Sequence, residues 1–110
     1  MRLYEYINTA WEILENSLSD KQKELRKENG EMGNLYCTFV SFVNNYLSGY
    51  KYFNSWIDEI DNEEINREVL TYSEALYLVL QNNHGLFIKK EVNKEIMKYL
   101  SENKNNIIIY

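Results

Sequence analysis

The chain has 110 residues and a formal net charge of −5, and its 45% hydrophobic and 26% charged residues are typical of one globular domain rather than a disordered segment. The absence of proline favours long helices over a loop-rich or β-turn-rich fold. One cysteine excludes an intramolecular disulfide, and we find neither an apolar signal stretch nor a run of roughly 18 apolar residues, so we expect a soluble cytoplasmic protein.

The first predicted helix covers residues 3–18. Its apolar residues recur at three- and four-residue steps, the pattern of an amphipathic helix: Leu3, Ile7, Ala10, Trp11, Leu14 and Leu18. Residues 20–29 are charged and rich in helix formers, and they either continue this helix into solvent or restart it with Ser19 or Asp20 as N-cap. We expect Gly30 and Gly33 to end this helical region.

The next predicted helix runs from about residue 34 to residue 48 and should be the most buried one. Two neighbouring apolar stripes cover more than half of its circumference. They are Leu35, Phe39, Phe42 and Tyr46, and Tyr36, Val40, Val43 and Leu47. Cys37 lies in this apolar helix and is expected to be an inert core thiol. Gly49 is suited to the C′ position that ends the helix.

Two further helices are predicted in the middle of the chain. A short aromatic helix covers residues 50–60, and a longer one covers about 63–81. The longer helix is either unbroken or interrupted at Thr71, because residues 61–64 and 71–74 both have the spacing of a capping box. The sequence Asn-Asn-His-Gly at residues 82–85 should stop it, which places His84 in an exposed turn.

The last predicted helix covers about residues 90–102. It is flanked by the short apolar runs 86–88 and 107–110, which are either two small paired strands or, at the end of the chain, a tail packed on the bundle. The predicted fold is therefore mostly α. Residues 1–110 should form a single compact domain of about five helices, with a minor two-stranded β element near the C-terminus left open.

The chain carries no recognisable catalytic, metal or nucleotide motif. His84 is the only histidine, and no His/Cys cluster has the spacing of a zinc site. The acids at residues 58–64 lack the glycine that a Ca²⁺ loop requires at its sixth position. There is no glycine-rich phosphate loop. We therefore expect a protein that is not an enzyme and that uses no metal or cofactor.

Charge is distributed unevenly along the chain. Residues 31–85 carry eight acids against Lys51 and Arg67, whereas residues 86–110 carry five lysines against three acids. A focused negative field speeds association with a basic partner, and Tyr and Trp are enriched at interface hot spots. The predicted partner-binding residues are Asp58, Glu59, Asp61, Glu63 and Glu64 for charge, with Tyr50, Tyr52 and Trp56 as aromatic anchors.

The acidic, aromatic centre predicts a non-enzymatic inhibitor that binds a basic nuclease or other nucleic-acid-processing enzyme. Its carboxylates would occupy the groove that otherwise holds phosphates. In general character, as a small acidic helical protein, the chain resembles the immunity proteins that neutralise bacterial nuclease toxins and the phage inhibitors of bacterial defence nucleases, such as anti-CRISPR proteins. No site residue is carried over from them. The abundance of Asn, Lys, Ile, Tyr and Glu indicates an AT-rich genome, compatible with a low-GC bacterium or its phage.

Two other interpretations stay open. The acids and tyrosines also fit helix starts and rings packed in a core with their hydroxyls at its rim. Lys90, Lys94 and Lys98 step at four-residue intervals and give the last helix a basic face, so a small helical DNA-binding regulator or adaptor is the alternative function. Three glutamates lie nearby in the sequence, so direct nucleic-acid binding is not favoured, and the oligomeric state is left open.

Overall fold

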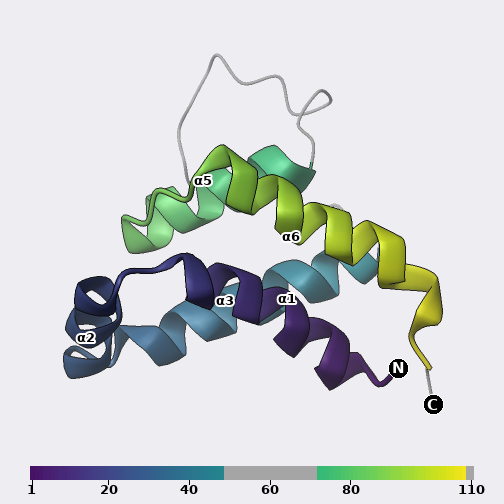
Figure 1. The fold of residues 1–110 in the computed structure, drawn as a ribbon, viewed down its shortest axis with the longest axis horizontal. Helices are drawn as coiled ribbons and strands as arrows, with labels where there is room; N and C mark the ends of the chain where they lie inside the picture. Colours follow the sequence, from purple (N-terminus) through teal and green to yellow (C-terminus); the bar gives the residue numbers. More distant parts are fainter. Residues whose placement is uncertain (49–71, 109–110) are drawn as a thin grey trace.

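The computed structural model describes residues 1–48 and 72–108, and this part of the chain is all-α (Figure 1). Its elements are α1 (Leu3–Ser17), α2 (Asp20–Glu28), α3 (Glu31–Ser48), α5 (Tyr72–His84), α6 (Lys90–Asn103) and the short 3₁₀ helix η1 (Lys104–Asn106). The mostly α fold predicted from the sequence is confirmed. Within the described ranges no helix is long and apolar enough to cross a membrane.

Four helices surround the core, and α2 lies at one end of the molecule. In Figure 1, α1 and α3 form the lower layer, and α5 and α6 cross above them. α1 contacts both α3 and α6, and α5 contacts α3 and α6. The largest fully buried side chains come from all four helices and from the connection after α5: Tyr6, Leu14, Leu35, Phe39, Phe42, Leu76, Leu80, Leu86, Ile96 and Leu100.

α3 is the central helix that its apolar stripes predict. Leu35, Phe39, Phe42 and Tyr46 are all buried, and the neighbouring stripe is buried at Val43 and half-buried elsewhere. Cys37 is exposed, so the expectation of a core thiol is wrong. The reason is its position on the helix, since Cys37 shares one face with the exposed residues at positions 41, 44 and 48, which follow at four- and three-residue steps.

Local sequence sets the boundary between α2 and its neighbours. Ser19 is the N-cap of α2, and its Oγ accepts a hydrogen bond from the Gln22 N–H at 3.2 Å, so the helix restarts rather than continues. Gly30 has a φ of 71°, which reverses the chain. α3 then begins at Glu31, about three residues before the predicted start. Gly33 therefore lies inside α3, and the expectation that it ends the preceding helix is wrong.

α5 runs three residues past its predicted end at Gln81, because the stop is set by Gly85 rather than by the asparagines. Gly85 has a φ of 58°, and its N–H donates to the Gln81 carbonyl at 3.0 Å. This is the αL motif that commonly ends a helix. The next N–H, that of Leu86, donates to the Leu80 carbonyl at 3.1 Å and turns the chain toward α6.

The apolar runs that flank α6 form no strand within the described residues. Leu86 and Ile88 are buried in the core, so the first run serves as an extended connection between α5 and α6. Ile107 is half-buried, and the Ile108 N–H donates to the Met1 carbonyl at 2.7 Å. The tail therefore packs beside the start of α1 as far as Ile108. Residues 109–110, like the predicted helix 50–60, Gly49 and Thr71, lie outside the described residues.

A buried tyrosine ties the first helix to the last. The Tyr6 side chain is fully buried, and its hydroxyl donates to the Leu100 carbonyl oxygen at 2.5 Å. Burial raises the pKa of Tyr6 well above its ordinary value, with smaller contributions from Tyr46 and Tyr99. We expect Tyr6→Phe to lower the free energy of unfolding by about 0.5–1.5 kcal/mol, because it removes one hydrogen bond and little volume.

Urea denaturation of the Tyr6→Phe variant, with Tyr4→Phe as its control, measures this difference. Tyr4 lies on the same helix but is 58% exposed, so its replacement should leave the midpoint unchanged. Equal midpoints for the two variants would show that the Tyr6 hydroxyl contributes nothing to stability.

Candidate functional site

The predicted partner-binding residues all lie outside the described residues. They are Asp58, Glu59, Asp61, Glu63, Glu64, Tyr50, Tyr52 and Trp56. Their part in binding stays a prediction. What the structure describes is the place at which residues 49–71, here called the acidic segment, join the bundle.

The acidic segment is attached at two neighbouring points. α3 ends at Ser48 before it, and α5 begins at Tyr72 after it. The ring of Tyr46, in the last turn of α3, lies edge-on to the ring of Tyr72, with the two centroids 5.0 Å apart and an interplanar angle of 87°. Burial raises the pKa of Tyr46, and Tyr72 raises it further. This aromatic contact therefore holds together the two ends between which the acidic segment is inserted.

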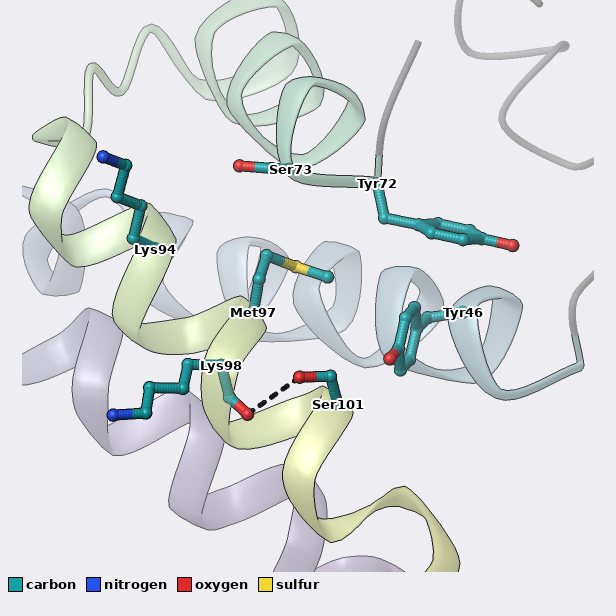
Figure 2. Close-up of a pocket in the computed structure, with 7 residues that line it drawn as sticks. All are labelled: Tyr46, Tyr72, Ser73, Lys94, Met97, Lys98 and Ser101. Carbon is teal, nitrogen blue, oxygen red and sulfur yellow. Dashed lines mark hydrogen bonds between the residues drawn. The ribbon is translucent and has the colours of Figure 1, made fainter. Parts of the chain in front are cut away.

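A pocket open to solvent lies beside this aromatic contact (Figure 2). It has a volume of about 530 Å³ and is lined from α3, α5 and α6 by Tyr46, Tyr72, Ser73, Lys94, Met97, Lys98 and Ser101. Figure 2 shows the two tyrosine rings at one end and Met97 in the middle, with the side chains of Lys94 and Lys98 extending away from the rings. The pocket thus has an aromatic end and a cationic end.

The basic face expected on the last helix is present. Lys90, Lys94 and Lys98 are all exposed on α6. In residues 1–48 and 72–108, neither Lys94 nor Lys98 forms an ion pair with a carboxylate. Their spacing is visible in the sequence, and residues 94, 97, 98 and 101 fall on one helical face. That Tyr46 and Ser73 complete the pocket was missed, because they come from helices that only the tertiary fold brings alongside.

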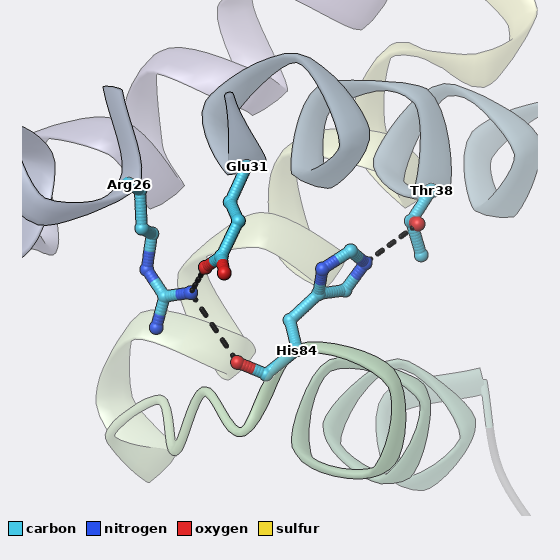
Figure 3. A network of polar contacts seen from close by, with 4 residues as sticks. All are labelled: Arg26, Glu31, Thr38 and His84. Atoms are coloured by element: carbon cyan, nitrogen blue, oxygen red, sulfur yellow. Dashed lines mark hydrogen bonds and ion pairs between the residues drawn. The ribbon is translucent and has the colours of Figure 1, made fainter. Parts of the chain in front are cut away.

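A second polar cluster lies where α2, α3 and α5 meet (Figure 3). The Arg26 Nη1 donates to the His84 carbonyl oxygen at 3.3 Å and lies 3.5 Å from the Glu31 Oε2. The His84 Nε2 lies 2.7 Å from the Thr38 Oγ1. The Thr38 hydroxyl also donates to the Asn34 carbonyl at 3.1 Å, so we assign the proton of the first contact to Nε2.

His84 is half-buried, so the expectation of an exposed turn residue is wrong. The His84 ring is covered because α2 and α3 pack against the end of α5. The position of His84 next to Gly85 in the sequence does not predict this packing. Burial lowers the pKa of His84 from 6.5, the Arg26 guanidinium lowers it further, and the Glu31 carboxylate opposes them. The cluster ties three helices together through a neutral imidazole.

The lowered pKa of His84 predicts a stability that falls in mild acid. The unfolded chain binds a proton at His84 more readily than the folded protein does, so stability is complete above about pH 6.5 and decreases as the pH drops below it. In this pH range, His84→Gln should make the free energy of unfolding depend less on pH. Glu31→Gln should make it depend more on pH, because this substitution removes the negative charge that favours the imidazolium form of His84.

Urea unfolding of the native protein and of both variants between about pH 5 and 8 measures the slope of the free energy of unfolding against pH. Identical slopes for the native protein and His84→Gln would contradict the role given to the imidazole. The two proteins share all their carboxylates, so a difference between their slopes reports on His84.

Among the described residues, no group of three or more His, Cys, Asp or Glu side chains comes together as metal ligands would. Comparison of the chain with protein-family models, with curated proteins and with solved structures finds no match.

Proposed function

We propose that this protein is a non-enzymatic inhibitor that binds a basic, nucleic-acid-processing enzyme and occupies its nucleic-acid groove. The observation that carries the proposal is the distribution of charge. The acidic segment contains six acids against two bases, whereas residues 1–48 and 72–108 contain eleven acids against ten bases. Four of the five net negative charges therefore belong to 23 consecutive residues, and the helical bundle is close to neutral.

The attachment of the acidic segment supports this proposal. Because Tyr46 and Tyr72 are in contact, the end of α3 and the start of α5, between which the segment is inserted, lie close together. A concentrated charge of one sign on a nearly neutral scaffold attracts a partner of the opposite sign. Grooves that hold nucleic acid carry clustered Lys and Arg, which bind carboxylates as well as phosphates.

Competition with nucleic acid tests the proposal. The protein is used to capture basic enzymes from a bacterial lysate, and each captured enzyme is purified and bound to it again in the presence of increasing nucleic acid. Displacement of the protein by nucleic acid is expected, since both occupy the same groove. A complex that contains enzyme, protein and nucleic acid together would contradict the proposed mechanism.

A DNA-binding regulator is the second candidate, because Lys90, Lys94 and Lys98 are exposed along one face of α6. Phosphate contacts through these lysines require an affinity for DNA that decreases steeply with salt. A gel-shift assay at low and moderate salt separates the two functions. The proposed inhibitor leaves DNA unshifted at both salt concentrations, whereas a regulator shifts it at low salt through α6.

A further inference from the structure

We propose that a hollow between the start of α1, the end of α3 and the tail that begins with η1 binds a fatty acid. This terminal hollow has a volume of about 530 Å³, which lies within the range of small-molecule sites. Its apolar wall is formed by Leu3, Leu47, Ile107 and Ile108, and its polar rim by Asn44, Ser48, Lys104 and Asn105. The proposal goes beyond the proposed inhibition, because the terminal hollow belongs to the bundle and not to the acidic segment.

The apolar wall is accessible to an alkyl chain. Leu3 is 41% exposed and Ile108 is 51% exposed, so each has carbon atoms in contact with water that a ligand can cover. A second hollow of about 500 Å³ adjoins the first, because Leu3 and Ile108 line both, and Arg2 and Tyr4 complete it. The two hollows form one elongated trough. Of the five large apolar side chains that are exposed in the described residues, three line this trough, and such clustering marks a binding surface.

The side of the hollow that the tail forms is held in place. The Ile108 N–H donates to the Met1 carbonyl at 2.7 Å, and the Tyr99 hydroxyl donates to the Met1 Sδ at 3.7 Å. Figure 1 shows the tail after α6 beside the N-terminus. Ile107 and Leu47 are half-buried and pack against the core. The wall is therefore formed before a ligand binds, which lowers the entropy lost on binding.

The polar rim is suited to a carboxylate. The Lys104 Nζ lies 5.2 Å from the Tyr46 ring centroid, a cation–π contact that positions the ammonium group and leaves its hydrogen-bond donors available. Among the residues that the structure describes, Lys104 forms no ion pair, and the side-chain amides of Asn44 and Asn105 form no hydrogen bond. A carboxylate at the rim can accept hydrogen bonds from these groups, and such charge-assisted bonds are strong.

The charge of the trough favours a fatty acid over a second copy of the protein. Its charged lining residues within the described ranges are Arg2 and Lys104, and both are positive. In a two-fold symmetric dimer the same patch of each copy meets the other, which would bring these cations together. An alkyl chain that ends in one carboxylate matches both the apolar wall and the positive charge.

Isothermal titration of the full chain with octanoate, hexanoate and octylammonium tests the proposal. We expect octanoate to bind about tenfold more tightly than hexanoate, because each of its two additional methylenes contributes a factor of about four when it is buried. Octylammonium has the same chain with a positive head and should bind about tenfold more weakly than octanoate. Lys104→Gln should weaken octanoate binding by about tenfold, whereas Lys104→Arg keeps the charge and should retain most of the affinity.

A matched pair of variants tests the apolar wall. Leu3→Ser should weaken octanoate binding, whereas Leu25→Ser removes an equally exposed leucine from α2 and should keep the affinity, with thermal denaturation verifying that both variants are folded. Equal affinities of these two variants, equal binding of octanoate and octylammonium, or no saturable binding of octanoate at millimolar concentration would overturn the proposal. So would a native dimer that Leu3→Ser dissociates, or binding to phosphatidylglycerol vesicles that Leu3→Ser abolishes, because a second copy or a membrane would then cover the trough.

Discussion

Replacing Phe39 by alanine is expected to lower the free energy of unfolding by about 3–5 kcal/mol, because it leaves a cavity that the surrounding helices fill only in part. Phe39 is fully buried in α3 and packs against Trp11 of α1, with ring centroids 5.7 Å apart. A domain of this size has a total stability of about 5–15 kcal/mol, so the loss is a large fraction of it.

The matched control is Phe87→Ala, which removes the same ring from a position that is 65% exposed. Its effect should stay within about 0.5 kcal/mol, since the ring is already largely in water. Urea denaturation of the two variants measures the difference. Similar losses at both positions would mean that α3 is not the centre of the core.

Neutralising the acidic segment is expected to slow association with the proposed partner enzyme by about 10- to 10³-fold, because electrostatic steering raises association rates by this factor. The five substitutions are Asp58→Asn, Glu59→Gln, Asp61→Asn, Glu63→Gln and Glu64→Gln. They keep the size and polarity of each side chain and remove its charge. The remaining rate should depend only weakly on salt, because less charge is left to be screened.

A control variant separates position from total charge. Five exposed glutamates of the bundle are replaced by glutamine: Glu5, Glu12, Glu24, Glu28 and Glu95. The change in net charge is the same, but these acids are spread over three helices. Stopped-flow association measured at several salt concentrations should show a small effect for this variant. Equal slowing in both variants would mean that net charge, and not its placement, attracts the partner.

The helices were predictable wherever local sequence decides them. The apolar spacing of α1, α3 and α6 places each helix within about three residues of its observed bounds, because the buried face of a helix repeats every three to four residues. Boundaries were less certain where one glycine decides the turn. Gly30 and Gly85 have positive φ and end their helices, whereas Gly33 is tolerated inside α3. The sequence alone does not distinguish these roles.

Contacts between distant residues were not predictable. His84 was expected in a turn just after a helix, whereas it is the last residue of α5. Its partners Arg26 and Thr38 lie on helices distant in the sequence. The same holds for the pocket, where the α6 face was visible and its partners Tyr46 and Ser73 were not. Such pairs depend on how helices pack, and a periodic pattern specifies only which face is buried.

We propose that carboxylates in residues 58–64 block the groove of a nucleic-acid-processing enzyme. The most direct measurement is the rate at which the captured enzyme cleaves or processes its nucleic acid with the native protein, the five-acid variant and the control variant present. We expect strong inhibition by the native protein and by the control variant, and little inhibition by the five-acid variant. Inhibition of equal strength by all three, or undiminished activity with the native protein, would contradict it.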